Sequence, residues 1–253
     1  MELLVFGHPG GVRVLVFPTR GGRFYDYEDW GLVAAQAEPL AWWRRQLYCL
    51  DSVDHESLYA LHLSPAERLA RHRAYEAYVR EEVIPLTERI SGNGPLWTHG
   101  CSLGAYHAVN FALRHPGLCS RAVGLSGRYN LTEAVGNYPA LLDPQADADT
   151  YFQTPPWFIR GMPEGESLRR LRALHVWLGV GDEDVFAASN HELATTLRQK
   201  GLRCDLELWP GEAHRARYWR PALARGMGDG ARSRTVPASR GVGPSRIPQR
   251  AWA

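Results

Sequence analysis

The stretch Gly100-Cys101-Ser102-Leu103-Gly104 is the most informative part of this chain, because its surroundings predict a serine at the tip of a tight turn. Residues 95–99 form a short apolar run typical of a buried strand, and residues 105–114 have the composition of a helix. Side chains in place of the two glycines would collide with the neighbouring strand and helix. The turn therefore predicts a serine hydroxyl raised above a sheet, at a helix N-terminus that favours negative charge.

A G-x-S-x-G pattern alone is weak evidence, since roughly one chain of this length in ten contains it by chance. It can equally be a Gly-rich turn that binds nothing. The strand and helix that flank it strengthen the case for a nucleophile elbow, in which a strained turn exposes a nucleophilic serine. Partner residues in the expected order downstream strengthen it further.

The bulk composition is typical of a globular chain, with 253 residues, 45% hydrophobic and 22% charged side chains. The net charge is +2, but residues 226–253 hold five arginines and one aspartate, so residues 1–225 are slightly negative. We therefore expect no nucleic-acid partner. The four cysteines form no CxxC pair and are expected to be buried thiols.

The composition also divides the chain into two parts. Residues 1–225 are expected to form one domain, whereas residues 226–253 are rich in Gly, Pro, Ser and Arg and are expected to be a disordered tail. The N-terminal residues lack the basic start and apolar core of a signal peptide, and no apolar run reaches 18 residues. These features predict a cytoplasmic protein without a membrane span.

Apolar, β-rich runs alternate with helical segments along residues 1–225. The predicted strands are residues 3–6, 12–17, 47–50, 95–99, 122–127, 174–178 and 204–209. The first two flank His8-Pro9-Gly10-Gly11 and are expected to pair as a β-hairpin. Strands alternating with helices predict an α/β fold with a mostly parallel central sheet that is covered by helices on both faces.

Helix signals are clearest in two places. Ser64, Pro65 and Glu67 form a capping box that opens a helix with Tyr75, Val79, Val83, Leu86 and Ile90 on one face. Residues 185–200 form a second helix, which Gly201 closes. Residues 128–163 contain five prolines and many aromatic residues, and we expect an irregular segment that shapes a pocket.

A serine hydroxyl needs a base to take its proton, and the base needs an acid that fixes its tautomer. In a fold with this elbow, the acid follows a late strand and the histidine follows the last strand. His214 follows the strand that ends at Trp209, and we expect it to be the base. Asp184 directly precedes the next helix and is the expected acid; Asp182 is the alternative, with helix capping as its other role.

The same chemistry needs two N–H donors for the oxyanion of a tetrahedral intermediate. Leu103, next to the serine, supplies the first through its backbone. The second is expected in the loop after residues 12–17, from Arg20 or, alternatively, from Thr19. The adjacent Gly21-Gly22 lets this loop approach the site, although it can also be a simple turn.

Residues 51–56, Asp-Ser-Val-Asp-His-Glu, combine oxygen donors with an imidazole and resemble part of a metal site. No second cluster completes such a site in the sequence. We therefore expect a polar rim beside the substrate here, and neither a metal nor a cofactor.

These residues together resemble the "putative esterase" family of α/β-hydrolases, which includes esterase D-like enzymes, feruloyl esterases and mycolyltransferase-like proteins. The matching segments are residues 14–22, 48–54, 100–116, 125–127, 181–184 and 211–219. The resemblance implies an α/β-hydrolase fold, a triad of Ser102, Asp184 and His214, and a small-molecule ester substrate. Two departures stand out: Pro18-Thr19 replaces the usual His-Gly, and Arg215-Ala216-Arg217 follows His214 where an acid and a Trp are usual.

Three functions are compatible with this pattern. The leading expectation is a serine carboxylic-ester hydrolase that works through an acyl-enzyme on Ser102. An acyltransferase to an alcohol or sugar acceptor would use the same residues. A non-catalytic binding protein on a hydrolase scaffold is the third, because of the altered residues after His214.

Overall fold

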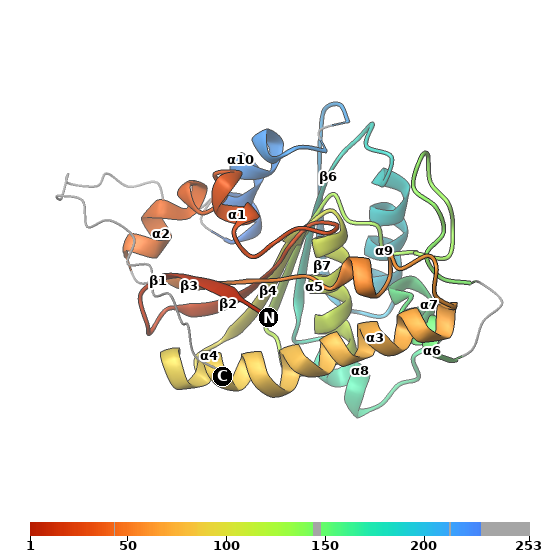
Figure 1. Cartoon of the computed structure of the whole chain (residues 1–253), viewed down its shortest axis with the longest axis horizontal. Helices are drawn as coiled ribbons and strands as arrows, with labels where there is room; N and C mark the ends of the chain where they lie inside the picture. The colour runs from red at the N-terminus through yellow and green to blue at the C-terminus, as the bar shows by residue number, and fades with distance from the viewer. Residues whose placement is uncertain (43, 144–147, 213, 229–253) are drawn as a thin grey trace.

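The computed structural model describes residues 1–42, 44–143, 148–212 and 214–228, which form a seven-stranded sheet flanked by helices (Figure 1). The strands are β1 (Leu3–Gly7), β2 (Val12–Phe17), β3 (Arg45–Leu50), β4 (Leu96–Cys101), β5 (Arg121–Leu125), β6 (His175–Gly181) and β7 (Arg203–Trp209). All seven predicted strands are thus present, with ends that differ by a few residues. Their order is β1-β3-β2-β4-β5-β6-β7.

The helices are α1 (Asp26–Asp29), α2 (Ala37–Ala41), α3 (Pro65–Tyr78), α4 (Ile84–Ser91), α5 (Leu103–Arg114), α6 (Ala148–Phe152), α7 (Pro155–Gly161), α8 (Glu166–Leu171), α9 (Ala187–Gln199) and α10 (Ala216–Gly226). The described residues also form three short helical turns: η1 (Ala34–Gln36), η2 (Asp54–Glu56) and the π-helical turn η3 (Val79–Val83).

The predicted hairpin between β1 and β2 is wrong. The strand β3 lies between them, antiparallel to β1 and parallel to β2, and every other neighbouring pair in the sheet is parallel. The glycines of the connection allow this arrangement, because a Cβ at Gly7 or Gly11 would lie 2.5 Å or 2.6 Å from backbone atoms of Arg45 in β3. The glycines of this connection therefore allow β3 to pack close to it, and they do not form a hairpin turn.

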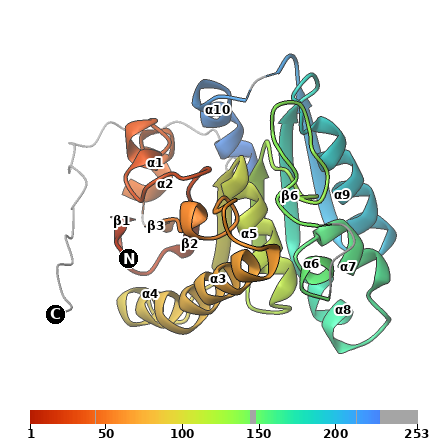
Figure 2. The same ribbon diagram turned by 45° about the vertical axis from the view of Figure 1, so that its right-hand side comes forward.

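Two helical layers cover the sheet, as the sequence predicts (Figures 1 and 2). Because side chains alternate along a strand, Val14 and Val16 pack with α1, α2 and α10 on one face, whereas Leu15 and Phe17 pack with α3, α5 and α9 on the other. All four cysteines are free and buried, in agreement with the expectation.

The helix that Ser64 opens has the predicted capping box, with Pro65 in its first turn. The predicted apolar face holds as far as Val83 and is kept in part beyond it, since Ile90 still packs against the core. The π-helical turn η3 inserts an extra residue at this point, so that Ile84 and Thr87 become the buried positions while Leu86 and Ile90 are partly exposed.

The prediction of an irregular segment at residues 128–163 is partly wrong, because its described part contains α6 and α7. Pro155 and Pro156 occupy the first turn of α7, where a missing N–H costs nothing. Proline therefore opens a helix here, although the composition of the segment indicates a loop.

The C-terminal prediction falls largely outside the described residues. Helix α10 ends at Gly226, Met227 packs in the core, and the description stops at residue 228. The expected tail beyond that point is not described. Within the described residues, no helix has the length and hydrophobicity needed to span a bilayer.

The elbow itself depends on two glycines, as predicted. A Cβ at Gly100 would lie 2.2 Å from backbone atoms of Gly104 in α5. A Cβ at Gly104 would lie 2.3 Å from the carbonyl oxygen of Phe17 and 2.4 Å from that of Pro18, at the end of β2. The start of α5 and the end of β2 are thus in backbone contact, which places the loop after β2 beside the elbow.

We expect Gly104→Ala to lower the free energy of unfolding by about 3 kcal/mol, because the new methyl group has only backbone atoms to displace. Urea unfolding followed by circular dichroism measures this. Gly94→Ala is the matched control, since its Cβ would meet nothing closer than 3.9 Å. Equal stability of the two variants would contradict the close approach.

Candidate active site

Ser102 occupies a strained backbone conformation between β4 and α5. Its φ is 57° and its ψ is −123°, which is rare for a residue with a side chain. Its N–H donates to the carbonyl oxygen of Leu125 at the end of β5, 2.8 Å away. The flanking strand and helix hold this geometry, and the side chain is left partly exposed.

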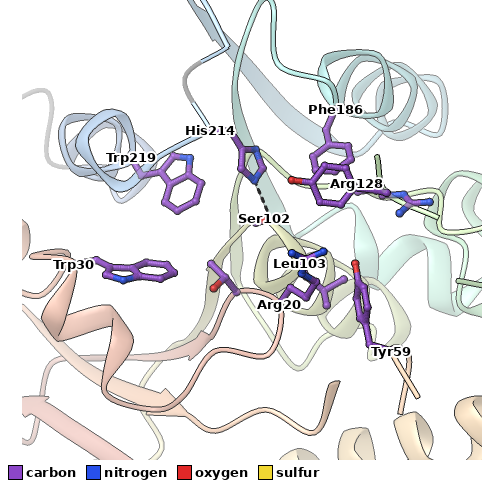
Figure 3. A pocket seen from close by; sticks show the side chains of 11 residues that line it. Arg20, Trp30, Tyr59, Ser102, Leu103, Arg128, Phe186, His214 and Trp219 are labelled. Carbon is purple, nitrogen blue, oxygen red and sulfur yellow. Dashed lines mark hydrogen bonds between the residues drawn. The ribbon is translucent and has the colours of Figure 1, made fainter. Parts of the chain in front are cut away.

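The structure brings Ser102, His214 and Asp184 together from three separate loops. His214 Nε2 lies 3.0 Å from Ser102 Oγ (Figure 3), and His214 Nδ1 lies 2.9 Å from Asp184 Oδ2. The Asp184 side chain is fully buried, and its other oxygen accepts the N–H of Phe186 at 3.0 Å. The imidazole is therefore held between an acid and a hydroxyl.

The hydrogen-bond partners of His214 determine which of its ring nitrogens carries the proton. An ionised carboxylate only accepts, so Nδ1 must carry the proton that faces Asp184. In a neutral ring this leaves the lone pair of Nε2 to accept the hydroxyl proton of Ser102. The arrangement can thus move a proton from Ser102 Oγ to the imidazole.

Asp182, the alternative acid, lies on the surface and does not face His214. Its Oδ1 accepts the N–H of Gly211 at 2.7 Å, so it fastens the loop that carries His214. Its other predicted role, capping α9, is wrong, because the N-cap of that helix is Phe186, whose N–H donates to Asp184 and not to Asp182.

Two aromatic side chains hold the ring of His214 in place. Phe186 and Trp219 each contact it edge to face, with ring centroids 5.5 Å and 5.4 Å away. Trp219 is fixed in turn, since its Nε1 donates to Ser126 Oγ at 3.1 Å. The residues that depart from the esterase pattern, Arg215 to Arg217, form the N-cap and the start of α10. The same helix carries Trp219.

Leu103 and Arg20, the predicted oxyanion donors, line the same cavity as Ser102. Neither backbone N–H donates to another of the described residues. Thr19, the alternative donor, lines the cavity as well. The next residue in the loop, Gly21, is anchored differently, because its N–H donates to Asp54 Oδ2 at 2.9 Å.

The expectation of a polar rim at residues 51–56 is wrong for Asp54, which is buried beneath the loop that carries Arg20. Its second oxygen, Oδ1, lies 3.0 Å from His107 Nε2 on α5. Beside this pair, burial and the neighbouring His107 lower the pKa of His72 to about 4. Sequence reasoning missed this link, because its only signal was an acid in a loop and a histidine on the elbow helix.

The cavity beside Ser102 holds about 210 Å³, and Figure 3 shows side chains that line it. Five aromatic side chains line it: Trp30, Tyr59, Tyr138, Phe186 and Trp219. Among the described residues of the segment at 128–163, which is predicted to shape the pocket, Arg128 lines it together with one of these aromatics, Tyr138. The other four come from distant segments, which the sequence does not connect.

Two of the acidic side chains of residues 51–56 are engaged by other protein groups. Asp51 Oδ1 accepts from Arg23 Nε at 2.7 Å, and both oxygens of Asp54 are engaged as described above. Across the part of the chain that the structure describes, no group of three or more His, Cys, Asp or Glu side chains could hold a metal ion.

Comparisons with known proteins identify the family of the chain. The chain matches the family described as "Putative esterase" over residues 51–229, which is most of its length. No curated protein matches the chain.

Solved structures with the same fold include a ferulic acid esterase, at 17% identity and a TM-score of 0.63, covering 86% of this chain and 83% of that one. An S-formylglutathione hydrolase (FrmB) from Staphylococcus aureus has 17% identity and a TM-score of 0.61, covering 88% and 81%. One from Agrobacterium tumefaciens has 12% identity and a TM-score of 0.67, covering 90% and 87%. The chain therefore belongs to the putative esterase family and has the α/β-hydrolase fold.

Proposed function

We propose that this protein is a serine carboxylic-ester hydrolase that works through an acyl-enzyme on Ser102. The observation that carries the proposal is the hydrogen-bonded chain from Asp184 through His214 to Ser102 Oγ. Membership of the esterase family supports the same reaction class.

In the first half of the reaction, Ser102 Oγ attacks the carbonyl carbon of the ester while its proton passes to His214 Nε2. Asp184 stabilises the imidazolium that results. The tetrahedral intermediate then collapses, and His214 gives the proton to the departing alkoxide. The products of this half are a free alcohol and an acyl group bonded to Ser102.

In the second half, water takes the place of the alcohol. His214 accepts a proton from the water as its oxygen attacks the acyl carbon. The new tetrahedral intermediate expels Ser102 Oγ, which recovers its proton from His214. A carboxylic acid is released and the resting state returns.

The backbone N–H groups of Leu103 and Arg20 are the proposed oxyanion donors. Both are free of other partners within the described residues, and both line the cavity above Ser102. Donors fixed in advance stabilise the developing charge without a reorganisation cost. Asp54 supports this role indirectly, because it holds the next N–H of the same loop.

The cavity volume favours a small substrate. The cavity beside Ser102 has a volume of about 210 Å³. Short acyl chains fit such a space. The aromatic walls supply apolar contact, so esters with a short chain are the expected substrates.

The hydrogen-bonded order of Asp184, His214 and Ser102 favours catalysis over a silent binding protein. The altered residues after His214 do not disturb the imidazole, since Trp219 packs against it. Product analysis with an added alcohol acceptor separates hydrolysis from acyl transfer.

Ser102→Ala is expected to lower kcat for p-nitrophenyl acetate by at least about a thousandfold, because the nucleophile is lost. A fluorophosphonate probe should label the wild-type protein at Ser102, as peptide mass spectrometry would detect, and should not label the variant. Turnover that survives in Ser102→Ala would disprove the proposal.

The two candidate acids give a matched pair of variants. Asp184→Asn should reduce kcat by about a thousandfold or more, because an amide no longer holds His214 in the required tautomer. Asp182→Asn keeps an oxygen that can accept from Gly211, and we expect a loss of less than about tenfold. The opposite order of the two effects would reassign the acid.

Asp54→Ala is expected to lower kcat by about tenfold or more with a smaller change in KM, because the loop that carries Arg20 loses its anchor. Asp54→Asn should restore part of the rate, since its amide oxygen can still accept from Gly21. Asp51→Ala is the matched control: it removes a carboxylate from the same segment that pairs with Arg23 instead. If all three variants keep the wild-type kcat, Asp54 does not position the loop.

A further inference from the structure

We infer that the substrate of this site carries a carboxylate close to the scissile ester, and that Arg20, with Arg128 behind it, recognises that carboxylate. The inference rests on the proposed function and narrows its substrate class. It is drawn from the charges of the cavity wall, the surroundings of the two arginines and the small volume that they share with Ser102.

The lining of the cavity is cationic. Arg20 and Arg128 both contribute to it, and no aspartate or glutamate is among the described residues that line it. Three acids around the site are engaged elsewhere: Asp184 is fully buried behind His214, Asp54 bonds to Gly21 and His107, and Glu133 accepts from Asn130 Nδ2 at 3.0 Å. A neutral ester would leave these positive charges uncompensated.

The surroundings of the Arg20 side chain favour a role in binding over a structural role. Its guanidinium lies 5.4 Å from the ring centroid of Tyr59 (Figure 3) and 5.6 Å from that of Tyr138. The side chain is exposed, and it forms no ion pair within the described part of the chain. Its side chain also hydrogen-bonds to that of Tyr59, and the other N–H groups of its guanidinium match a carboxylate in a two-pronged geometry.

Arg128 adds a buried positive charge at the same cavity. It is 2% exposed, and its Nε and Nη2 donate to the backbone carbonyls of Asn130, Glu133 and Pro139. Its Nη1 is buried without an acceptor among the described residues. Burial lowers the pKa of Arg128 and outweighs the nearby charge of Glu133, which favours the charged guanidinium. An anion in the cavity would therefore stabilise this arrangement.

The size of the cavity limits where the carboxylate can be. Ser102, Arg20 and Arg128 all line a space of about 210 Å³. An anion that reaches the arginines is therefore only a few bonds from the carbonyl that Ser102 attacks. Half-esters of short dicarboxylic acids and acyl esters of small hydroxy acids have this form.

Two matched pairs of esters test the inference. Monoethyl succinate against ethyl succinamate places the charge on the acyl side, and 4-acetoxybenzoate against 4-acetoxybenzamide places it on the alcohol side. In the wild-type protein, kcat/KM should be higher for the carboxylate by about tenfold or more in at least one pair. In Arg20→Gln that ratio should fall toward one, whereas Arg20→Lys should keep part of it.

Arg217→Gln is the matched control, because Arg217 is exposed, stacks on Tyr218 and does not line the cavity. It should keep the wild-type ratio. A ratio near one in both pairs, with Ser102-dependent hydrolysis of the neutral esters, overturns the inference and leaves the proposed function intact. An unchanged ratio in Arg20→Gln also overturns it.

The proposed function fails separately, if Ser102→Ala hydrolyses these esters as fast as the wild type. If no ester is turned over although the fluorophosphonate probe labels Ser102, the rate of labelling replaces turnover as the readout. Succinate should then slow labelling more than succinamide does, and equal effects of the two would overturn the inference.

Discussion

The backbone contact between Gly104 and the end of β2 is the constraint on which the site depends. With carbonyl oxygens of Phe17 and Pro18 only 2.3 Å and 2.4 Å from where a Cβ would lie, the start of the loop after β2 packs directly against the elbow. The same contact brings the N–H of Leu103, on the elbow, and that of Arg20, on the loop, to one cavity. The oxyanion site proposed here is thus a consequence of packing two backbones together.

Two carboxylates hold the loops of the site from outside it. Asp54 accepts the N–H of Gly21 in the loop after β2, and Asp182 accepts the N–H of Gly211 in the loop after β7. Each bond fixes a glycine whose φ is positive, 60° at Gly21 and 86° at Gly211, and which would otherwise be free to rearrange. Because the second of these loops carries His214, both halves of the proposed machinery are held in place before a substrate binds.

The sequence alone predicts the parts of this molecule that depend on order along the chain. Ser102, Asp184 and His214 each follow a strand of a parallel sheet, so their meeting follows from the strand pattern. Pairing between distant segments has no such local signal. The insertion of β3 between β1 and β2, the bond between Asp54 and His107, and the aromatic wall drawn from five separate regions are all contacts of this kind. Local composition also misleads where proline opens α7 instead of ending a helix.

The loop after β2, which departs from the usual His-Gly pattern, carries Arg20, and this residue contributes to the site in two ways. Its backbone N–H is a proposed oxyanion donor, while its guanidinium, which lies near the rings of Tyr59 and Tyr138, faces the same cavity. A carboxylate bound by the side chain would therefore also restrain the backbone that binds the oxyanion. Binding energy from a part of the substrate that does not react would then act on the transition state, so recognition and rate would be coupled through one residue.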